Sequence, residues 1–225
     1  MDGNGRWAKS RSLPRSSGHQ KGVKSVRTIV KHCAKIGVNT LTLFAFSSEN
    51  MNRPSKEVGL LFKLFLTVLK NETKKLNDNN IKLDIIGDLS VFAPETQTLA
   101  ERAQKQLQNN TGLNLVIAAN YGGQWDIAEA AKKIANKVVK GEINPEKIDK
   151  NVFGGHTSLA QYPKVDLLIR TSGEVRISNF LLWDIAYSEL YFCDTLWPDF
   201  DANDLDIAIK NFHSRDRRFG ERNGE

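Results

Sequence analysis

The chain alternates between short runs of β-branched or leucine-rich residues and longer segments with helical spacing of apolar positions. The short runs, which we expect to be strands, span residues 40–46, 82–87, 113–119 and 165–170. The longer segments, which we expect to be helices, span residues 22–36, 55–79, 94–109, 125–140 and 201–218. This alternation predicts an α/β fold with a central, mostly parallel sheet flanked by helices.

Local signals support several of these boundaries. Gly37 is expected to stop the first helix, Ser55 to cap the second, and Pro94 to open the third. We find no internal repeat and no linker, so we expect a single domain over residues 1–225. A glycine-rich motif begins at residue 2, where a bare terminus would be expected to fray. We therefore expect either that a first strand precedes residue 1 and is missing from this sequence or that the start is misassigned.

Composition and charge limit the classes of molecule that this protein is expected to bind. The 225 residues are 40% hydrophobic, which is enough for a sizeable core, and they carry a net charge of +6 with a pI near 9.3. Such a charge suits nucleic acid, an acidic membrane surface or an anionic substrate. The basic residues form no run of five or more, and the prominent arginines stand beside glycines and hydroxyls. A focused site for a small polyanion is therefore favoured over a nucleic-acid surface.

Cysteine usage and hydropathy indicate the compartment. Cys33 and Cys193 lack CxxC spacing, so we expect free thiols in a reducing, cytoplasmic environment. No apolar run approaches the roughly 18 residues of a membrane span, and no signal peptide is evident.

The segment RTSGEVRISNFLLW, residues 170–183, has the chemistry of a phosphate site. Arg170 and Arg176 offer planar forks of donors, the hydroxyls of Thr171, Ser172 and Ser178 add further donors, and Gly173 allows close backbone approach. The alternative is that the two arginines are solvated or pair with Glu174.

The opening MDGNGRW, residues 1–7, repeats this theme with a carboxylate in front of the glycines. Asp2 beside a phosphate site suggests a hard cation between them, whereas the alternative is an Asx turn before Gly3. His19 precedes the helix expected to start near Gly22, where its ring could face an anion. An ordinary surface histidine is an equal alternative.

Polar residues also follow each expected strand. The sets are Ser47, Ser48, Glu49, Asn50 and Arg53; Gly87 and Asp88; Asn120, Tyr121, Gly122 and Gly123; and residues 171–178. Ligands of open α/β sheets lie beyond the carboxyl ends of the strands, so we expect one site at one sheet edge.

Two further features each have two interpretations. Glu189 stands in a mostly apolar stretch, where either a structural salt bridge or a metal or subunit contact would stabilise its carboxylate. The helix over residues 58–69 is apolar on more than one face, as expected for core packing or for the wall of an apolar cavity. Ala45 and Ala119 on neighbouring strands are small enough to leave room for such a cavity.

Several enzyme classes lack their motifs here. The chain has no GxxxxGK[ST], no GxGxxG after a strand, no HExxH, no GxSxG and no paired Cys/His ligands. It also lacks the adjacent aspartates of all-helical prenyl synthases. A phosphate site with a lone aspartate and an apolar wall needs another explanation.

The ordered motifs resemble the cis-prenyltransferases over residues 1–220, and in particular the bacterial members that make a long lipid product. The motifs are MDGNGRWA, GHxxG from Gly18, FSSENxNRP from Phe46, NYGG from Asn120, and RTSGE leading to Glu189. The resemblance implies sequential condensation of isopentenyl diphosphate onto farnesyl diphosphate with new cis double bonds and Mg²⁺ as cofactor. It also implies an apolar product tunnel, a homodimer and peripheral membrane contact through the lipid product. No nucleic-acid partner is expected, because the four tryptophans stand among apolar or motif residues rather than interleaved with Lys and Arg.

The resemblance implies the following residue roles. Asp2 would hold Mg²⁺ and assist departure of the allylic diphosphate, Glu189 would complete the metal site, and Asn50 would orient the homoallylic substrate. The allylic diphosphate would be bound by the backbone of Gly3, Asn4 and Gly5 with Arg6, Trp7, Arg15 and His19. Isopentenyl diphosphate would be bound by Arg170, Arg176 and Ser178, with Ser47, Ser48, Glu49, Met51 and Arg53 also contacting substrate. Residues 215–220 would approach the active site of the partner subunit.

Two residues depart from the family pattern: Met51 replaces a common aromatic residue, and Asp184 stands where glutamine is frequent. Two alternatives to the long-chain synthase remain. One is a catalytically silent relative that binds lipid or a partner, and the other is a synthase of shorter products.

Overall fold

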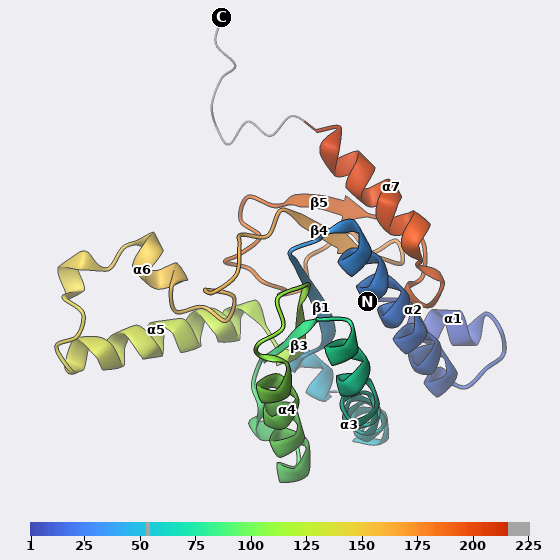
Figure 1. The fold of residues 1–225 in the computed structure, drawn as a ribbon, viewed down its shortest axis with the longest axis horizontal. Coiled ribbons are helices and arrows are strands. Elements are labelled where there is room, and N and C mark those ends of the chain that lie inside the picture. The colour runs from blue at the N-terminus through green and yellow to red at the C-terminus, as the bar shows by residue number, and fades with distance from the viewer. Residues whose placement is uncertain (53–54, 216–225) are drawn as a thin grey trace, which may run out of the picture. The chain divides into compact units, whose positions relative to one another are not determined.

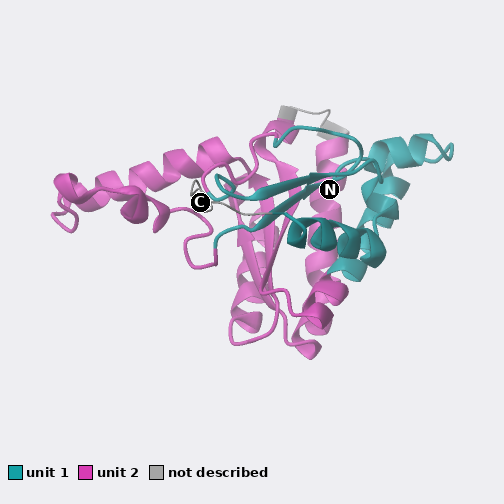
Figure 2. Ribbon diagram, turned by 90° about the horizontal axis from the view of Figure 1, so that it is seen from above, with its two compact units in different colours: residues 1–29, 164–177, 184–225 teal, residues 30–163, 178–183 magenta. Residues whose placement is uncertain are grey.

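The computed structural model describes residues 1–52 and 55–215, apart from the side chains of residues 52, 55 and 56, and its chain forms two compact units. Unit 1 contains residues 1–29, 164–177 and the chain from residue 184 onward (Figure 2). Unit 2 contains residues 30–163 and 178–183. The chain passes between the units within the phosphate-type segment, because residues 177 and 178 fall in different units.

Unit 2 is built on a parallel sheet in the order β1, β3, β2 (Figure 1). The strands are β1 (Thr40–Ser47), β2 (Lys82–Ile86) and β3 (Asn114–Tyr121). Register pairs Leu43 with Ile117 and Leu83 with Leu115. The central strand is almost wholly buried, which explains its continuous apolar sequence rather than an alternating one.

The helices of unit 2 are α3 (Ser55–Asp78), α4 (Pro94–Leu107), α5 (Gly123–Val139) and the short α6 (Lys150–Gly154). Of these, α3 and α4 contact each other and strand β2, whereas α5 and α6 extend away from the sheet (Figure 1). Pro94 is the first residue of α4, as predicted, and the α4 face bearing Ala100, Ala103 and Leu107 is buried. The cap predicted at Ser55 falls on a side chain outside the described part.

Unit 1 contains α1 (Asn4–Lys9), the part of α2 (Arg15–Ile36) up to residue 29, a second sheet and α7 (Ala202–His213). The second sheet pairs β4 (Leu167–Arg170) in parallel with β5 (Glu189–Phe192). The Asp201 side chain caps α7, and the Asp204 carboxylate accepts a hydrogen bond from the Asp201 N–H, which completes a capping box. This capping box explains why the helix begins where the sequence predicts.

The predicted start of the second helix near Gly22 is wrong, because α2 begins at Arg15. The glycines that suggested a boundary lie inside the helix and allow α1 to approach. A Cβ at Gly18 would lie 2.0 Å from the Asn4 carbonyl oxygen, and one at Gly22 would lie 2.4 Å from Asn4 Oδ1. Both positions therefore require glycine for helix packing rather than for a turn.

The α/β class, with a parallel sheet flanked by helices, is confirmed. The four predicted strands are present, but only three share one sheet, since β4 pairs with β5 instead. The sequence analysis missed α1, α6 and β5, which are all short. The last predicted helix ends at His213, and the predicted residues 216–218 lie outside the described chain. Among the described residues, no helix is both long and apolar enough to cross a membrane.

Candidate functional site

In unit 1, the segment before α1 lies against the loop that follows β4. Gly3 caps α1 with φ +98°, and a Cβ there would lie 2.8 Å from Leu196 Cδ2 and 3.0 Å from Ser172 Cβ. Both the left-handed backbone and the space require glycine. The backbone of Asp2 bonds the Thr171 hydroxyl, its N–H donating over 3.1 Å and its carbonyl accepting over 3.2 Å. The residues 1–3 are thus held to the start of the phosphate-type segment.

The Asp2 carboxylate is paired with Arg170. Oδ2 of Asp2 accepts from Arg170 Nε at 3.0 Å and from Nη2 at 2.9 Å. The Arg170 side chain is 13% exposed and the Asp2 side chain 45% exposed. The arginine is therefore rigidly presented from the end of β4, while the carboxylate remains accessible to a ligand.

Arg6 and Arg176 share the carboxylate of Glu174. Arg6 Nη2 donates to Glu174 Oε1 at 2.8 Å and to Ser172 Oγ at 2.6 Å. Arg176 Nη1 pairs with Glu174 Oε2. The pairing with Glu174 that the sequence left open is therefore present for Arg176, and it holds both guanidinium groups in the loop that follows β4.

Arg15 lies close to the glycines of the opening motif. A Cβ at Gly5 would lie 3.1 Å from Arg15 Nε, so the guanidinium packs directly against the Gly5 backbone. Arg6, Arg15, Arg170 and Arg176 thus belong to one unit, where together they provide a strongly basic environment.

The prediction that His19 precedes a helix is wrong. Because α2 begins at Arg15, His19 lies in its second turn and is half-buried. The helix N-terminal amides that were expected to share an anion with His19 are one turn earlier.

Trp7 is fixed by a residue that the sequence analysis missed. Its Nε1 donates to Asp199 Oδ1 at 2.7 Å, and Arg11 pairs with Asp199 Oδ2 at 3.1 Å. The Arg11 guanidinium also lies over the Trp7 ring, 4.3 Å from its centroid. This cluster holds α1 against the 3-10 helix Trp197–Asp199.

Glu189, the first residue of β5, forms the salt bridge that was one of its two interpretations. Arg215 Nη1 donates to Glu189 Oε2 at 2.7 Å. Asn211 Oδ1 accepts hydrogen bonds from Nε and Nη2 of the same arginine at 3.1 and 2.8 Å. Within the described residues, no three His, Cys, Asp or Glu side chains cluster as metal ligands. Of the predicted metal ligands, Asp2 bonds Arg170 and Glu189 bonds Arg215.

In unit 2, β1 ends at Ser47 and continues into the 3-10 helix η1 (Ser48–Asn52). The Asn50 side chain turns back, and its Oδ1 accepts weakly from the Ser47 N–H at 3.4 Å. Met51 is 37% exposed. Arg53 lies outside the described residues, so its predicted contact with substrate stays a prediction.

The Glu49 carboxylate is held by hydrogen bonds. Asn179 Nδ2 donates to Glu49 Oε1 at 2.7 Å. Partial burial by itself would raise the pKa of Glu49, but bonds from its own backbone N–H and from Asn179, Ser47 and Ser48 outweigh it and lower the pKa. The carboxylate therefore stays ionised at neutral pH.

The apolar residues of α3 pack partly into an aromatic cluster. Phe62 and Phe65 contact Phe46 on β1 and Phe92 after β2, with centroids between 4.5 and 6.1 Å apart. Ala119 on β3 and Leu113, which directly precedes β3, are buried, whereas Ala45 is partly exposed. Core packing thus accounts for one face of α3.

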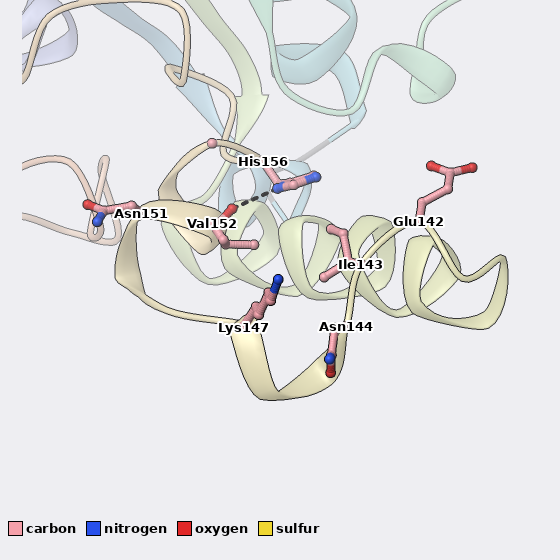
Figure 3. Close-up of a pocket in the computed structure, with 8 residues that line it drawn as sticks. Glu142, Ile143, Asn144, Lys147, Asn151, Val152 and His156 are labelled. Atoms are coloured by element: carbon pink, nitrogen blue, oxygen red, sulfur yellow. Dashed lines mark hydrogen bonds between the residues drawn. The ribbon is translucent and has the colours of Figure 1, made fainter.

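A pocket of about 370 Å³ is lined by residues that follow α5 in the chain, some of them in α6 (Figure 3). Its lining includes Glu142, Lys147, Asn151 and His156, and the His156 Nδ1–H donates to the Val152 carbonyl at 2.7 Å. None of the predicted site residues lines it. The pocket is open to solvent and is no candidate for the phosphate chemistry.

Sequence reasoning missed Asp199, Asn179 and Asp126. Asp126 is 2% exposed, and its carboxylate accepts from Tyr121, from the Ser158 N–H and from the Ser158 hydroxyl. A carboxylate in the first turn of α5 was a visible signal, because an acidic residue there is favourable. Its partner Ser158, 32 residues away, could not be read from the sequence.

Comparison with known proteins identifies relatives over nearly the whole chain. The family model Prenyltransf, described as undecaprenyl diphosphate synthase, matches residues 1–220. A Vibrio cholerae ditrans,polycis-undecaprenyl-diphosphate synthase, specific for (2E,6E)-farnesyl diphosphate, is 53% identical over 98% of this chain and 88% of its own length. The Pasteurella multocida enzyme of the same name is 52% identical over 98% of this chain and 92% of its own.

Two solved structures of prenyl diphosphate synthases have folds similar to that of this chain. A lavandulyl diphosphate synthase from Lavandula x intermedia, in complex with dimethylallyl diphosphate, has a TM-score of 0.94 at 38% identity, over 98% of this chain and 95% of that chain. A probable undecaprenyl diphosphate synthase from Campylobacter jejuni has a TM-score of 0.79 at 33% identity, over 90% and 93%. The resemblance noted from the motifs therefore extends to the three-dimensional structure.

Proposed function

We propose that the chain, which belongs to the undecaprenyl diphosphate synthase family of cis-prenyltransferases, extends farnesyl diphosphate to undecaprenyl diphosphate. Each cycle adds one isopentenyl diphosphate with a cis double bond. The product would serve as precursor of the lipid carrier for cell-wall synthesis. The observation that carries this proposal is the Asp2–Arg170 pair, flanked by Gly3 and by the Arg6 and Arg176 guanidinium groups.

The chemistry explains why such a cluster is needed. When the allylic C1–O bond breaks, negative charge develops on the departing diphosphate, and the electron pair of the isopentenyl double bond then forms the new bond to C1. A proton leaves the isopentenyl C2. Preorganised donors stabilise the developing charge far better than water does. Arg6, Arg15 and His19, with the backbone amides of Gly3, Asn4 and Gly5, would bind the allylic diphosphate.

Arg170, Arg176 and Ser178 would bind the isopentenyl diphosphate. Glu174 holds the Arg176 guanidinium in the loop before substrate arrives. Arg170 is held by Asp2 in the same way. A diphosphate oxygen can compete for donors on either arginine, because each guanidinium offers five N–H groups. Trp7, Ser47, Ser48, Glu49, Met51 and Arg53 would complete the contacts to substrate.

A divalent cation fits the donor set at Asp2, and we propose Mg²⁺. Mg²⁺ is usually bound through one or two carboxylates together with waters and substrate phosphates, so a single accessible aspartate suffices. When bound, the ion would neutralise charge on the leaving diphosphate. Glu189 would be a second ligand, which requires its bond to Arg215 to be exchanged for the metal.

Asn50 would orient the isopentenyl carbon skeleton near the proton that is lost. Its amide lies in η1, next to Ser47 at the end of β1. The growing chain needs an apolar tunnel that excludes water, and we assign its wall to the apolar residues of α3 with Ala45, Leu113 and Ala119.

We further propose a homodimer in the cytoplasm, with peripheral membrane contact through the lipid product and no nucleic-acid partner. Exposed apolar side chains near β5 and on α7 support the dimer: Tyr187 is 72% exposed, Ile207 50% and Leu190 36%. Light scattering of the wild type and of Tyr187→Glu tests it. A monomeric wild type would reject the dimer.

A second candidate product has a specific observation in its favour. The lavandulyl diphosphate synthase has the same fold, with a TM-score of 0.94. An enzyme that is named for a different product is therefore built on the same scaffold. A shorter product or a catalytically silent, lipid-binding protein are the alternatives.

The test is incubation with farnesyl diphosphate and radiolabelled isopentenyl diphosphate, with and without Mg²⁺, followed by separation of products by chain length. A Mg²⁺-dependent undecaprenyl product is expected. A short product would retain the chemistry and reject the assigned length. No product in either condition would favour the silent alternative.

A further inference from the structure

Asn179 connects two parts of unit 2 that are far apart in the sequence. Its Nδ2 donates to Glu49 Oε1 at 2.7 Å, and its Oδ1 accepts from the Gln124 N–H at 2.8 Å. Its backbone carbonyl accepts from the Gly123 N–H at 2.6 Å. One residue thus links η1, which follows β1, with the first turn of α5, which follows β3.

The start of α5 depends on Asn179 for its cap. The N-cap residue, Gly122, has no side chain to accept the first amides of the helix, and Asn179 accepts two of them from outside. A Cβ at Gly122 would lie 2.7 Å from Asn179 Nδ2 and 2.8 Å from Ser48 Oγ. The contact among Gly122, Ser48 and Asn179 is therefore tight, and glycine makes it possible.

The backbone around Asn179 is held in an uncommon conformation. Asn179 has φ +61°, and its neighbours Ser178 and Leu181 have φ +45° and +47°. Left-handed backbone is unfavourable for most residues with a Cβ and persists where surrounding contacts enforce it. Phe180 supplies such a contact by stacking on Phe44 with centroids 4.3 Å apart.

We propose that Asn179 is a positioning residue for the condensation: it sets the Glu49–Asn50 segment in register with the adjacent Ser178 hydroxyl. This inference rests on the proposed function, in which Ser178 binds the isopentenyl diphosphate and Asn50 orients the reacting carbons. Both ends of one substrate are then aligned through one residue, which bonds Glu49 beside Asn50 and directly follows Ser178 in the chain. Displacement of a positioned group by about 1 Å can cost 100-fold in rate.

Asn80 provides a matched control elsewhere in unit 2. It has φ +55°, its Oδ1 accepts from the Thr111 N–H at 2.9 Å, and its Nδ2 donates to Thr111 Oγ1 at 3.1 Å. Asn179→Gly and Asn80→Gly therefore remove the same kinds of bonds and both keep a left-handed backbone accessible. Asn80 lies in the turn before β2 and belongs to no part of the proposed site.

Steady-state kinetics and calorimetry distinguish positioning from mere stabilisation. We expect Asn179→Gly to lower kcat about tenfold or more and to raise the KM for isopentenyl diphosphate several-fold. It should also weaken the binding of inorganic pyrophosphate, which requires no turnover. Asn80→Gly should keep all three values within about twofold, with a comparable loss of thermal stability. Equal behaviour of the two variants would overturn the proposal.

A double-mutant cycle tests the bond to Glu49. Asn179→Asp keeps the acceptor for Gln124 but places a carboxylate against Glu49, whereas the pair Glu49→Gln with Asn179→Asp restores a donor and the original total charge. We expect the kcat loss of the double variant to be much smaller than the combined losses of Glu49→Gln and Asn179→Asp. Additive losses would remove Glu49 from the relationship and overturn the proposal.

Wild-type protein that yields no prenyl product would instead reject the proposed function, and the pyrophosphate comparison would still decide the role of Asn179.

Discussion

The Asp2 carboxylate accepts two hydrogen bonds from the Arg170 guanidinium, and both fall on Oδ2 at 3.0 and 2.9 Å. The pair joins the start of the chain to the end of β4, across 168 residues. Because Arg170 is nearly buried and Asp2 is not, the arginine is the fixed partner and the carboxylate is the group that a ligand can reach.

Replacing Asp2 by alanine should lower kcat about 100-fold or more, because the carboxylate is assigned to the cation and the departing diphosphate. The KM for isopentenyl diphosphate should change much less. Kinetics with each substrate varied in turn check this prediction. Asp78→Asn, at the exposed end of α3, is the control. Equal losses in kcat and in isopentenyl diphosphate binding would contradict the assigned role.

Arg170→Lys should raise the KM for isopentenyl diphosphate about tenfold, and Arg170→Ala should raise it further. Lysine keeps the charge but lacks the planar fork that bonds both phosphate oxygens and Asp2. Isothermal titration with a non-reactive isopentenyl diphosphate analogue gives the affinity directly. An unchanged KM in Arg170→Ala would remove Arg170 from the site.

Gly18→Ala should lower the free energy of unfolding by about 1–3 kcal/mol, because the new methyl would meet the Asn4 carbonyl at 2.0 Å and force α1 away from α2. Gly59→Ala is the matched control, since nothing beyond the adjoining residues and backbone of its own helix lies within 4 Å of the added carbon at this helical glycine. Alanine there should be neutral or stabilising by up to about 1 kcal/mol. Urea unfolding measures both, and a stable Gly18→Ala would show that α1 does not pack tightly on α2.

Burial raises the pKa of the Cys33 thiol to about 11. The thiol of the unfolded chain ionises near its ordinary value of 9.0, so the unfolded state loses this proton first as the pH rises. The contribution of Cys33 to stability is therefore complete below pH 9 and falls between pH 9 and 11. Unfolding measured across this range should be less pH-dependent in Cys33→Ala than in the wild type. Identical slopes would show that Cys33 is not the titrating group.

Arg215→Gln should lower the free energy of unfolding by at most about 1 kcal/mol, since the Glu189–Arg215 pair is partly exposed to solvent. If Glu189 exchanges this partner for a cation, the variant should bind Mn²⁺ at least as tightly as the wild type in the presence of pyrophosphate. Electron paramagnetic resonance of free Mn²⁺ measures this. Weaker binding would mean that Arg215 supports the metal site rather than competing with it.

Much of this protein follows from its sequence alone. Continuous apolar runs separated by periodic segments predict strands and helices because buried parallel strands and amphipathic helices need those patterns. The arginines, hydroxyls and glycines of residues 170–178 indicate phosphate chemistry because few other roles need these residue types together. Their order along the chain also carries the family resemblance.

Other features were decided only by the tertiary structure. The glycines at 18 and 22 look like a helix boundary in sequence, yet their role is set by Asn4 on another helix. The interpretation of Glu189 depended on Arg215, and the importance of Asn179 depended on Glu49 and Gln124. Hydrogen bonds and close approaches between residues distant in sequence leave no local periodic pattern, so only the folded chain reveals which side chains meet.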